Sequence, residues 1–218
     1  MGMVITIDGP AASGKSSVSR ELARRLGWQW VSTGAFYRGL AFAALQLQID
    51  LDDVKNLAEL THNPVWSVRM NEDRTRVFFQ DQDVTDLIAH EDVGNFASKV
   101  SHYPEVRKAL LDAQRGCSDG PQGLVAEGRD CGTVVFPKAE AKVYLTAHSA
   151  NRAARRAAEL GLDHEDMVKA QQQRDLQDST RKVAPMAVPE DALVVDTTTL
   201  NLEQVVDKVE QFVRSKVD

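Results

Sequence analysis

The chain has 218 residues, 43% of them hydrophobic, and a formal net charge of −6, which suits one sizeable domain with a full core. The acidic balance argues against a protein that coats nucleic acid, although it leaves room for a local basic pocket. No apolar run could span a bilayer, no signal peptide opens the chain and two cysteines make no disulfide framework, so we expect a cytoplasmic protein without membrane or nucleic-acid partners.

The first predicted unit is a strand, a glycine-rich loop and a helix. Residues 3–7 form a short β-branched run, and apolar residues recur at every fourth position over 18–26. Between them the pattern G-x-x-x-x-G-K-[ST] is matched by Gly9, Pro10, Ala11, Ala12, Ser13, Gly14, Lys15 and Ser16. Loop amides and the helix N-terminus face an anion in such units. The pattern therefore predicts that ATP binds here, with Lys15 at the β- and γ-phosphates and Ser16 at magnesium.

Strands and helices alternate through most of the remaining chain. Further core strands are predicted at residues 28–32, 124–126, 141–145 and 192–196. Helices are predicted at residues 35–47, 50–60, 86–90, 92–100, 164–176 and 202–213, with another beginning at Pro104 and an arginine-rich one around Arg152. Because strands that alternate with helices pair in parallel, we expect an α/β fold whose sheet is covered on both faces.

The pattern changes near residue 63. Residues 65–70 alternate apolar and polar side chains, a second strand is predicted at 76–80, and 82–84 could form a third. Such a meander inside a strand–helix pattern is typical of an inserted subdomain with its own antiparallel sheet.

Charged residues gather where predicted elements end. The three clusters are residues 33–38, the run Gly128-Arg129-Asp130, and the group Arg174, Asp178 and Arg181. Because the carboxyl ends of parallel strands meet at one edge of a sheet, we expect the first two clusters to share a cleft with Lys15. With the later arginines added, this cleft has more positive charge than one triphosphate needs. The sequence therefore predicts a second phosphorylated ligand that faces the first.

Several of these residues also allow a plainer interpretation. The alternatives are a solvated helix face for Arg152, Arg155 and Arg156, an exposed turn for Arg181 and Lys182, a surface ion pair for Arg129 and Asp130, simple packing for Tyr37, and a spacer role for Cys131. The buried strand directly before Arg129 favours a role in the cleft for that residue and its neighbour.

Four segments resemble bacterial cytidylate kinases, and the resemblance runs through the whole chain. They are residues 7–16, 33–38, 127–137 and 174–185. The stretch G-R-D-x-G-T-V-V-F-P at 128–137 is the most specific, because the phosphate loop alone indicates only a P-loop protein.

For the fold, the resemblance implies the P-loop nucleoside-monophosphate kinase architecture, with a five-stranded parallel sheet in the order 2-3-1-4-5 flanked by helices. Residues 1–218 would form a single domain. Its core would comprise residues 1–60, 104–149 and 183–218, with a strand-rich insertion that binds the monophosphate at 61–103 and a helical lid at 150–182.

For the activity, the resemblance implies a monomeric phosphotransferase of pyrimidine nucleotide metabolism that uses ATP and Mg²⁺ to convert CMP and dCMP to CDP and dCDP. Such a reaction needs no side-chain base, because the attacking oxygen belongs to an already anionic phosphate. Catalysis then depends on alignment and on stabilisation of charge. For that stabilisation the resemblance singles out Lys15, Arg129, Arg174 and Arg181.

Further residues receive binding roles from the same resemblance. Ser98, Arg107 and Asp130 correspond to residues that read cytosine. Contacts to the rest of the acceptor nucleotide are implied for Thr33, Tyr37, Arg38, Arg129, Arg174, Asp178 and Arg181. ATP contacts are implied for Gly9 to Ser17, Arg152 and Arg156, and magnesium contacts for Ser16, with Ser17 or, through water, Glu127 as alternatives.

The chain departs from the family pattern at several of these positions. Thr33 stands where many members have serine, Glu127 where aspartate is frequent, and Ser16-Ser17 where some have glycine and threonine. Gln177 and Ser179 replace arginines of some lids. We expect the remaining lid arginines to repel one another and to keep the lid open until phosphates bind.

Two other functional classes compete with this interpretation. A P-loop kinase for a sugar, shikimate or dephospho-coenzyme A would share the loop, but the insertion and the Arg129-Asp130 pair favour a nucleotide acceptor. A nucleotide switch of the GTPase type would need a guanine-reading N-K-x-D stretch, which the sequence lacks. The sequence contains no evident reader for the base of the phosphoryl donor.

Overall fold

A computed structural model describes residues 2–70, 74–120, 122–160 and 164–217, and it leaves out the side chains of residues 156, 159, 160, 164–167, 170 and 174. Five parallel strands form the central sheet, and their spatial order is β2 (Gln29–Ser32), β6 (Leu124–Gly128), β1 (Val4–Asp8), β7 (Ala141–Thr146) and β8 (Leu193–Asp196). Numbered in chain order within this sheet, the order is 2-3-1-4-5. The predicted fold class is confirmed.

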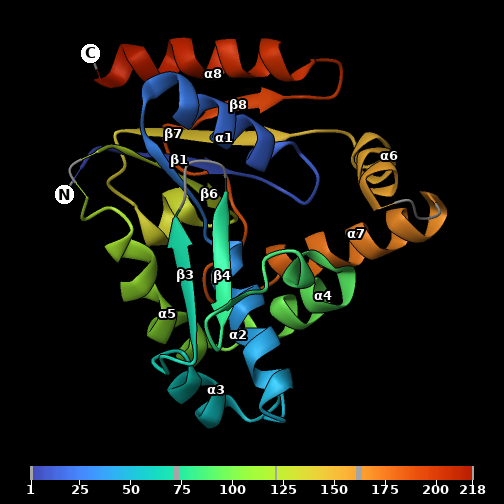
Figure 1. Cartoon of the computed structure of the whole chain (residues 1–218). Helices are drawn as coiled ribbons and strands as arrows, with labels where there is room; N and C mark the ends of the chain where they lie inside the picture. Colours follow the sequence, from blue (N-terminus) through green and yellow to red (C-terminus); the bar gives the residue numbers. More distant parts are fainter. Residues whose placement is uncertain (1, 71–73, 121, 161–163, 218) are drawn as a thin grey trace.

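Helices cover the sheet on both faces, and the central strand β1 is accordingly buried on both sides. Its Ile5 and Ile7 pack beneath α1 (Lys15–Leu26) and α8 (Leu202–Val217), whereas its Val4 belongs to the core of α2 (Gly34–Gln46) and α5 (Pro104–Gly116). Figure 1 shows α1 and α8 above the sheet and α2 and α5 below it. The N-terminus of α8 is closed by the reciprocal bonds of the Asn201 and Gln204 side chains and main chains.

The predicted insertion contains a second, antiparallel sheet. Its strands are β3 (Trp66–Met70), β4 (Thr75–Phe79) and β5 (Gln82–Asp83), between the short helix α3 (Val54–Leu60) and α4 (Glu91–Val100). The sheet is held on α2 at Gly39, where a Cβ atom would approach the Trp66 ring to 2.9 Å. The helix expected at 86–90 is only the 3₁₀ turn Leu87–Ala89, because His90 is extended (φ −57°, ψ 149°) and ends it.

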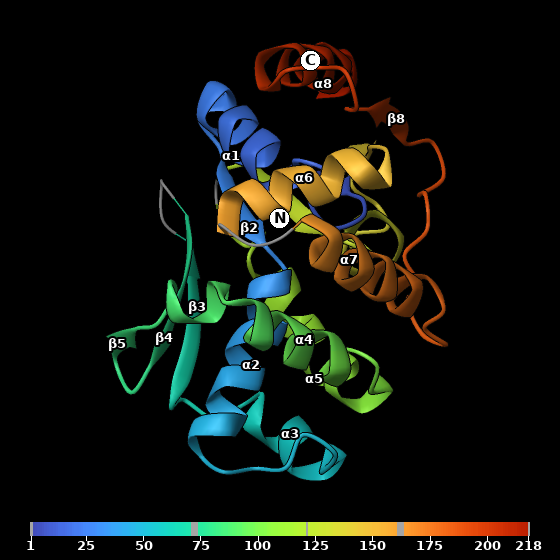
Figure 2. The same ribbon diagram turned by 90° about the vertical axis from the view of Figure 1, so that its right-hand side faces the viewer.

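Two helices form the predicted lid, α6 (Ser149–Leu160) and α7 (His164–Ser179), and they pack through Ala153, Ala157 and Val168. Helix α7 lies beside α4 of the insertion in both views (Figure 1 and Figure 2). The boundaries proposed for core, insertion and lid stay predictions. Among the described helices, none has both the length and the apolar composition needed to cross a bilayer.

Candidate active site

The glycine-rich loop connects β1 to α1 at the carboxyl edge of the sheet. Gly9 approaches β7 so closely that a Cβ atom would lie 2.1 Å from the Leu145 carbonyl oxygen. Gly14 adopts φ 91°, a conformation that side chains disfavour, and it turns the loop into α1. Because the residue that caps α1 is a glycine, no side chain of that residue covers the first amides, and an anion can reach them.

Lys15 is buried in this loop, with 7% of its surface exposed. Its Nζ donates a hydrogen bond of 2.6 Å to the carbonyl oxygen of Pro10. Burial, followed by the charge of Arg129, lowers the pKa of Lys15 to about 7, against the opposing effect of Glu127 and Asp8. The amine therefore lies in a site that favours its charged form only when further negative charge arrives.

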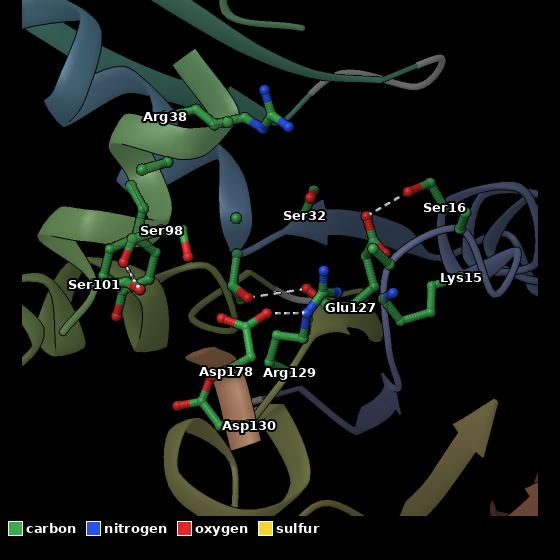
Figure 3. Close-up of a pocket in the computed structure, with 18 of the residues that line it drawn as sticks. Lys15, Ser16, Ser32, Arg38, Ser98, Ser101, Glu127, Arg129, Asp130 and Asp178 are labelled. Carbon is green, nitrogen blue, oxygen red and sulfur yellow. Dashed lines mark hydrogen bonds and ion pairs between the residues drawn. The ribbon is translucent and has the colours of Figure 1, made fainter. Parts of the chain in front are cut away.

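Ser16 and Glu127 form an oxygen-rich pair beside the lysine (Figure 3). The Ser16 hydroxyl donates to Glu127 Oε1 at 2.8 Å, across the gap between α1 and the end of β6. Hydroxyl and carboxylate oxygens are ligands that Mg²⁺ accepts, and this ion is usually held by one or two protein ligands together with phosphates. The pair therefore fits a magnesium ion that arrives with ATP, while Ser17 only lines the same cleft.

Asp8, the last residue of β1, directly precedes the loop, and its side chain is fully buried. Its carboxylate accepts hydrogen bonds from the main-chain amides of Cys131, at 2.8 Å, and Gly132, at 2.7 Å. These amides begin the π-helical turn Cys131–Val135, which the sequence analysis did not predict. Asp8 thus ties the phosphate loop to the segment of Arg129 and Asp130. Its signal in the sequence was a lone carboxylate at the end of an otherwise buried strand.

Arg129, Arg181 and Asp178 form the centre of the cleft. Arg129 donates through Nε to Asp178 Oδ2 at 2.8 Å and through Nη1 to the Gly9 carbonyl at 3.0 Å. Arg181 Nη2 lies 3.2 Å from Asp178 Oδ1, but it is buried and has no hydrogen-bond partner among the described residues. A buried donor that lines a cleft without a partner suits a phosphate oxygen.

The residues expected to read a base come together at the other end of the cleft. Asp130 pairs with Arg107, both side chains being at most 7% exposed, and Arg107 also donates to the Ser101 carbonyl. The Arg107 guanidinium lies 5.3 Å from the ring centre of Tyr37, whose pKa is raised to about 12 by burial. A surface ion pair between Arg129 and Asp130 is therefore excluded, since each has a different partner.

Two residues that are predicted to contact the acceptor nucleotide already form hydrogen bonds within the protein. Arg38 donates from Nη1 to the main-chain oxygens of Ile88 at 2.5 Å and His90 at 3.1 Å, while its side chain borders the cleft. The Thr33 hydroxyl donates to the Glu127 carbonyl at 2.9 Å. Cys131, which contacts Thr33 at 3.4 Å, is fully buried, so its spacer role agrees with the structure.

The lid arginines whose side chains the structure describes all have partners, and two of them, Arg152 and Arg181, lie beside carboxylates, which corrects the expectation of mutual repulsion for those two. Arg152 binds Asp175 at 2.7 Å and reaches the loop at the Ala11 carbonyl at 3.0 Å, so it is no solvated helix face. Arg155 binds the hydroxyl and carbonyl oxygens of Thr197. The expectation was based on the arginines alone and did not consider the carboxylates that lie between them. The side chains of Arg156 and Arg174 lie outside the described residues.

One cleft of about 290 Å³ between the phosphate loop, the insertion and the lid is lined by many of these residues, among them Lys15, Ser16, Glu127, Arg129, Asp130, Asp178 and Arg181. Its lining also includes residues that sequence reasoning missed, among them Glu91, Ser101 and Gln171. Gln171 is buried on α7, and its Oε1 has no partner among the described residues. No motif marks these positions, because only the packing of α4 and α7 brings them to the cleft.

Comparisons with known proteins point to one family. The sequence profile of the cytidylate kinase family matches residues 5–215. The chain is 88% identical over 217 residues to a cytidylate kinase of Bdellovibrio bacteriovorus, with 100% of both chains covered. It is 42% identical to a cytidylate kinase of Shewanella loihica, over 98% of this chain and 95% of that protein.

Solved structures agree on the fold. A gluconokinase from Sinorhizobium meliloti superimposes with a TM-score of 0.51 at 15% identity, over 98% of this chain and 92% of that one. At this identity the likeness shows the fold alone, and the residues at the acceptor end of the cleft must decide the substrate.

Proposed function

This chain belongs to the cytidylate kinase family, and we propose that its cleft aligns ATP with CMP or dCMP for direct transfer of one phosphoryl group. It is a phosphotransferase, and its products are ADP and CDP or dCDP. The observation that carries the proposal is that one cleft joins the phosphate loop at Lys15 to the buried acceptor group at Asp130.

The donor triphosphate lies along the loop between β1 and α1. The main-chain N–H groups of the loop, which all of residues 9–17 except Pro10 possess, surround its phosphates, and the Lys15 ammonium stabilises charge on the β- and γ-phosphates. Arg152 approaches the donor from the lid, since it already contacts the loop at Ala11, and Arg156 is proposed as a further ATP contact from the family resemblance alone. Ser16 and Glu127 would hold Mg²⁺, which supplies further positive charge between the phosphates when it is bound.

The acceptor nucleotide fills the opposite end. Arg38 and Arg129 orient its phosphate, and Nη2 of Arg181, which is paired with Asp178 but makes no hydrogen bond to it, stabilises the group in transfer. Asp130 accepts from the amino group of cytosine, with Ser98 and the Arg107 guanidinium beside it. Thr33, Tyr37, Asp178 and Arg174 complete the contacts to the nucleotide.

The chemistry requires only alignment and stabilisation of charge. The acceptor phosphate oxygen is already anionic near neutral pH, so no side chain has to remove a proton. Lys15, Arg129, Arg174 and Arg181 offset the charge that spreads over the transferring group. The lid lines the cleft through Gln171, Asp178 and Arg181, and its closure keeps water from taking the phosphoryl group.

The test is ADP formation by the full chain with ATP, Mg²⁺ and a panel of acceptors, namely CMP, dCMP, UMP, shikimate and gluconate. We expect CMP and dCMP to be the best acceptors. A better turnover with shikimate or gluconate, or ATP hydrolysis that ignores the acceptor, would overturn the proposal. We further propose a cytoplasmic monomer, for which light scattering should give the chain mass of 24.1 kDa.

A further inference from the structure

Two polar contacts join the insertion to Gln177 of the lid, and one of them starts at Ser98, which lines the acceptor end of the cleft. The Ser98 hydroxyl of α4 donates to Gln177 Oε1 of α7 at 3.2 Å. His102, one turn after Ser98, has its two ring nitrogens 2.7 Å from the Ser98 carbonyl and 3.2 Å from the Gln177 carbonyl. The His102 ring therefore lies between the α4 and α7 main chains, at the place where the Gln177 side chain reaches Ser98. Figure 3 shows Ser98 at the cleft wall, on the side of Ser101.

This contact determines which way the Ser98 hydroxyl acts. An amide oxygen only accepts hydrogen bonds, so the hydroxyl has to donate its one proton to Gln177. What Ser98 then offers to the cleft is a lone pair, that is, an acceptor. Because Ser98 is only 8% exposed, water does not readily compensate a ligand atom of the wrong kind at this position.

Cytosine and uracil differ in this respect. The amino group of cytosine has two N–H donors, one for the Asp130 carboxylate and one for an accepting Ser98. Uracil has an oxygen in the same place, which would meet two acceptors. A hydroxyl that could rotate freely would instead donate to that oxygen and tolerate uracil.

We propose that Gln177 is a positioning residue for base selection: by accepting the Ser98 proton it makes Ser98 an acceptor, so that the lid helix contributes to the preference for cytosine. The proposal rests on the proposed function. Gln177 lies on the exposed side of α7 and contributes no charge, so its substitution leaves Lys15, Arg129 and Asp178 in place.

Three substitutions separate hydrogen-bond polarity from structure. Gln177→Glu can only accept, Gln177→Leu can do neither, and Gln177→Lys can only donate. The measurement is the ratio of kcat/KM for CMP to kcat/KM for UMP, since a charge added at this position affects both nucleotide phosphates alike. We expect Glu to keep the wild-type ratio, Leu to lower it by about fivefold, and Lys to lower it further.

The matched control is Gln173→Leu, the same change at an exposed glutamine on the same helix. It should leave the ratio unchanged. Equal ratios in all three Gln177 variants, or an equal fall in Gln173→Leu, would overturn the proposal. If one of the three Gln177 variants fails to fold, the order of the CMP to UMP ratios in the other two still tests the proposal. A wild-type chain that does not phosphorylate CMP would contradict the proposed function instead, and the two failures are thus distinguishable.

Discussion

At the scale of single residues, the buried lysine of the phosphate loop has the clearest consequence. Burial, and after it the charge of Arg129, lowers the pKa of Lys15 from 10.5 to about 7. At pH 8 the protein without nucleotide therefore has mostly the neutral amine. The ATP phosphates place negative charge beside it and raise its pKa, so we expect binding to take up as much as about one proton. Titration calorimetry at pH 8 in two buffers of different ionisation enthalpy measures this uptake.

The control for this prediction is Lys15→Arg, which keeps a cation whose pKa stays far above 8. Proton uptake should disappear in that variant. The nucleotide does not obscure the result, because phosphate groups with a second pKa near 6 are deprotonated at pH 8. Equal heats in both buffers for the wild-type chain would contradict the lowered pKa.

Asp130 carries the second prediction at this scale. Its carboxylate is buried against Arg107 and lines the cleft, so removing the whole side chain would leave a guanidinium without its partner. Asp130→Asn keeps the shape but can turn an N–H donor toward the cytosine amino group. We expect kcat/KM for CMP to fall, and the CMP to UMP ratio to fall at least about tenfold. Kinetics with both nucleotides test this, and thermal unfolding reports the separate loss of the ion pair. An unchanged ratio would leave Asp130 with a structural role only.

At the scale of elements, local sequence patterns predicted the helices, strands and loops that depend only on neighbouring residues. The β-branched run, the glycine loop and the period of four up to Leu26 were enough to define β1, the loop and α1. In the other core strands, the observed first and last residues differ from the predicted ones by a few positions at most. The turn Cys131–Val135 escaped prediction, because its conformation depends on Asp8, more than a hundred residues away. The lid pairs escaped for a related reason, since the i, i+3 and i+4 spacing of arginines says nothing about a partner on another helix.

The hydrogen bonds between Asp8 of β1 and the turn Cys131–Val135 give the third prediction. Burial raises the pKa of Asp8 from 3.8 to about 6, although the amides of Cys131 and Gly132 oppose the shift. Between these values the folded chain binds the proton more tightly than the unfolded chain does. The contribution of Asp8 is therefore fully present below about pH 4 and is lost as the pH rises through 6. We expect this to lower the free energy of unfolding by about 3 kcal/mol.

Asp8→Asn isolates this contribution, because the amide does not titrate. The asparagine side chain has one acceptor oxygen for the amides of Cys131 and Gly132, where aspartate has two. This loss should lower the free energy of unfolding by the same amount at every pH. We expect the difference in free energy of unfolding between the wild-type chain and Asp8→Asn to shift in favour of the variant from pH 4 to 6. Denaturant unfolding at several pH values measures it, and parallel curves for the two proteins would count against the raised pKa.

At the scale of the whole molecule, the cleft exists because three parts of the chain converge on one sheet edge. Parallel strands bring the loop at Lys15 and the segment at Arg129 to the same side, which strand order alone could predict. The meeting of α4 with α7 could not be predicted in this way. It joins residues about 80 positions apart through Ser98 and Gln177, and no motif or period relates two such helices. The sequence therefore predicted the chemical groups of the cleft, but it did not predict the contacts between α4 and α7.

The lid is held to the loop by few groups, and this leads to the last prediction. Arg152 joins α6 to Asp175 of α7 and to the Ala11 carbonyl of the loop, so one ion pair connects both lid helices with the donor site. The pair is mostly buried, with 8% and 18% of its side chains exposed, so solvent screens it little. We expect Asp175→Asn to weaken the docking of α7 and to speed amide exchange in that helix by about tenfold.

Hydrogen exchange of the full chain, with and without ATP and CMP, measures this effect. In the wild-type chain, exchange in α7 should slow most when both nucleotides are present, because α7 faces the loop through Asp175 and the acceptor end through Gln177. Asp207→Asn is the matched control, since Asp207 also pairs with an arginine, Arg25 at 2.6 Å, but on α8. It should leave exchange in α7 unchanged. If Asp175→Asn exchanges like the control, the Arg152 pair does not hold the lid, and the Arg129–Asp178 pair, which also joins α7 to the loop at Gly9, remains as its link to the loop.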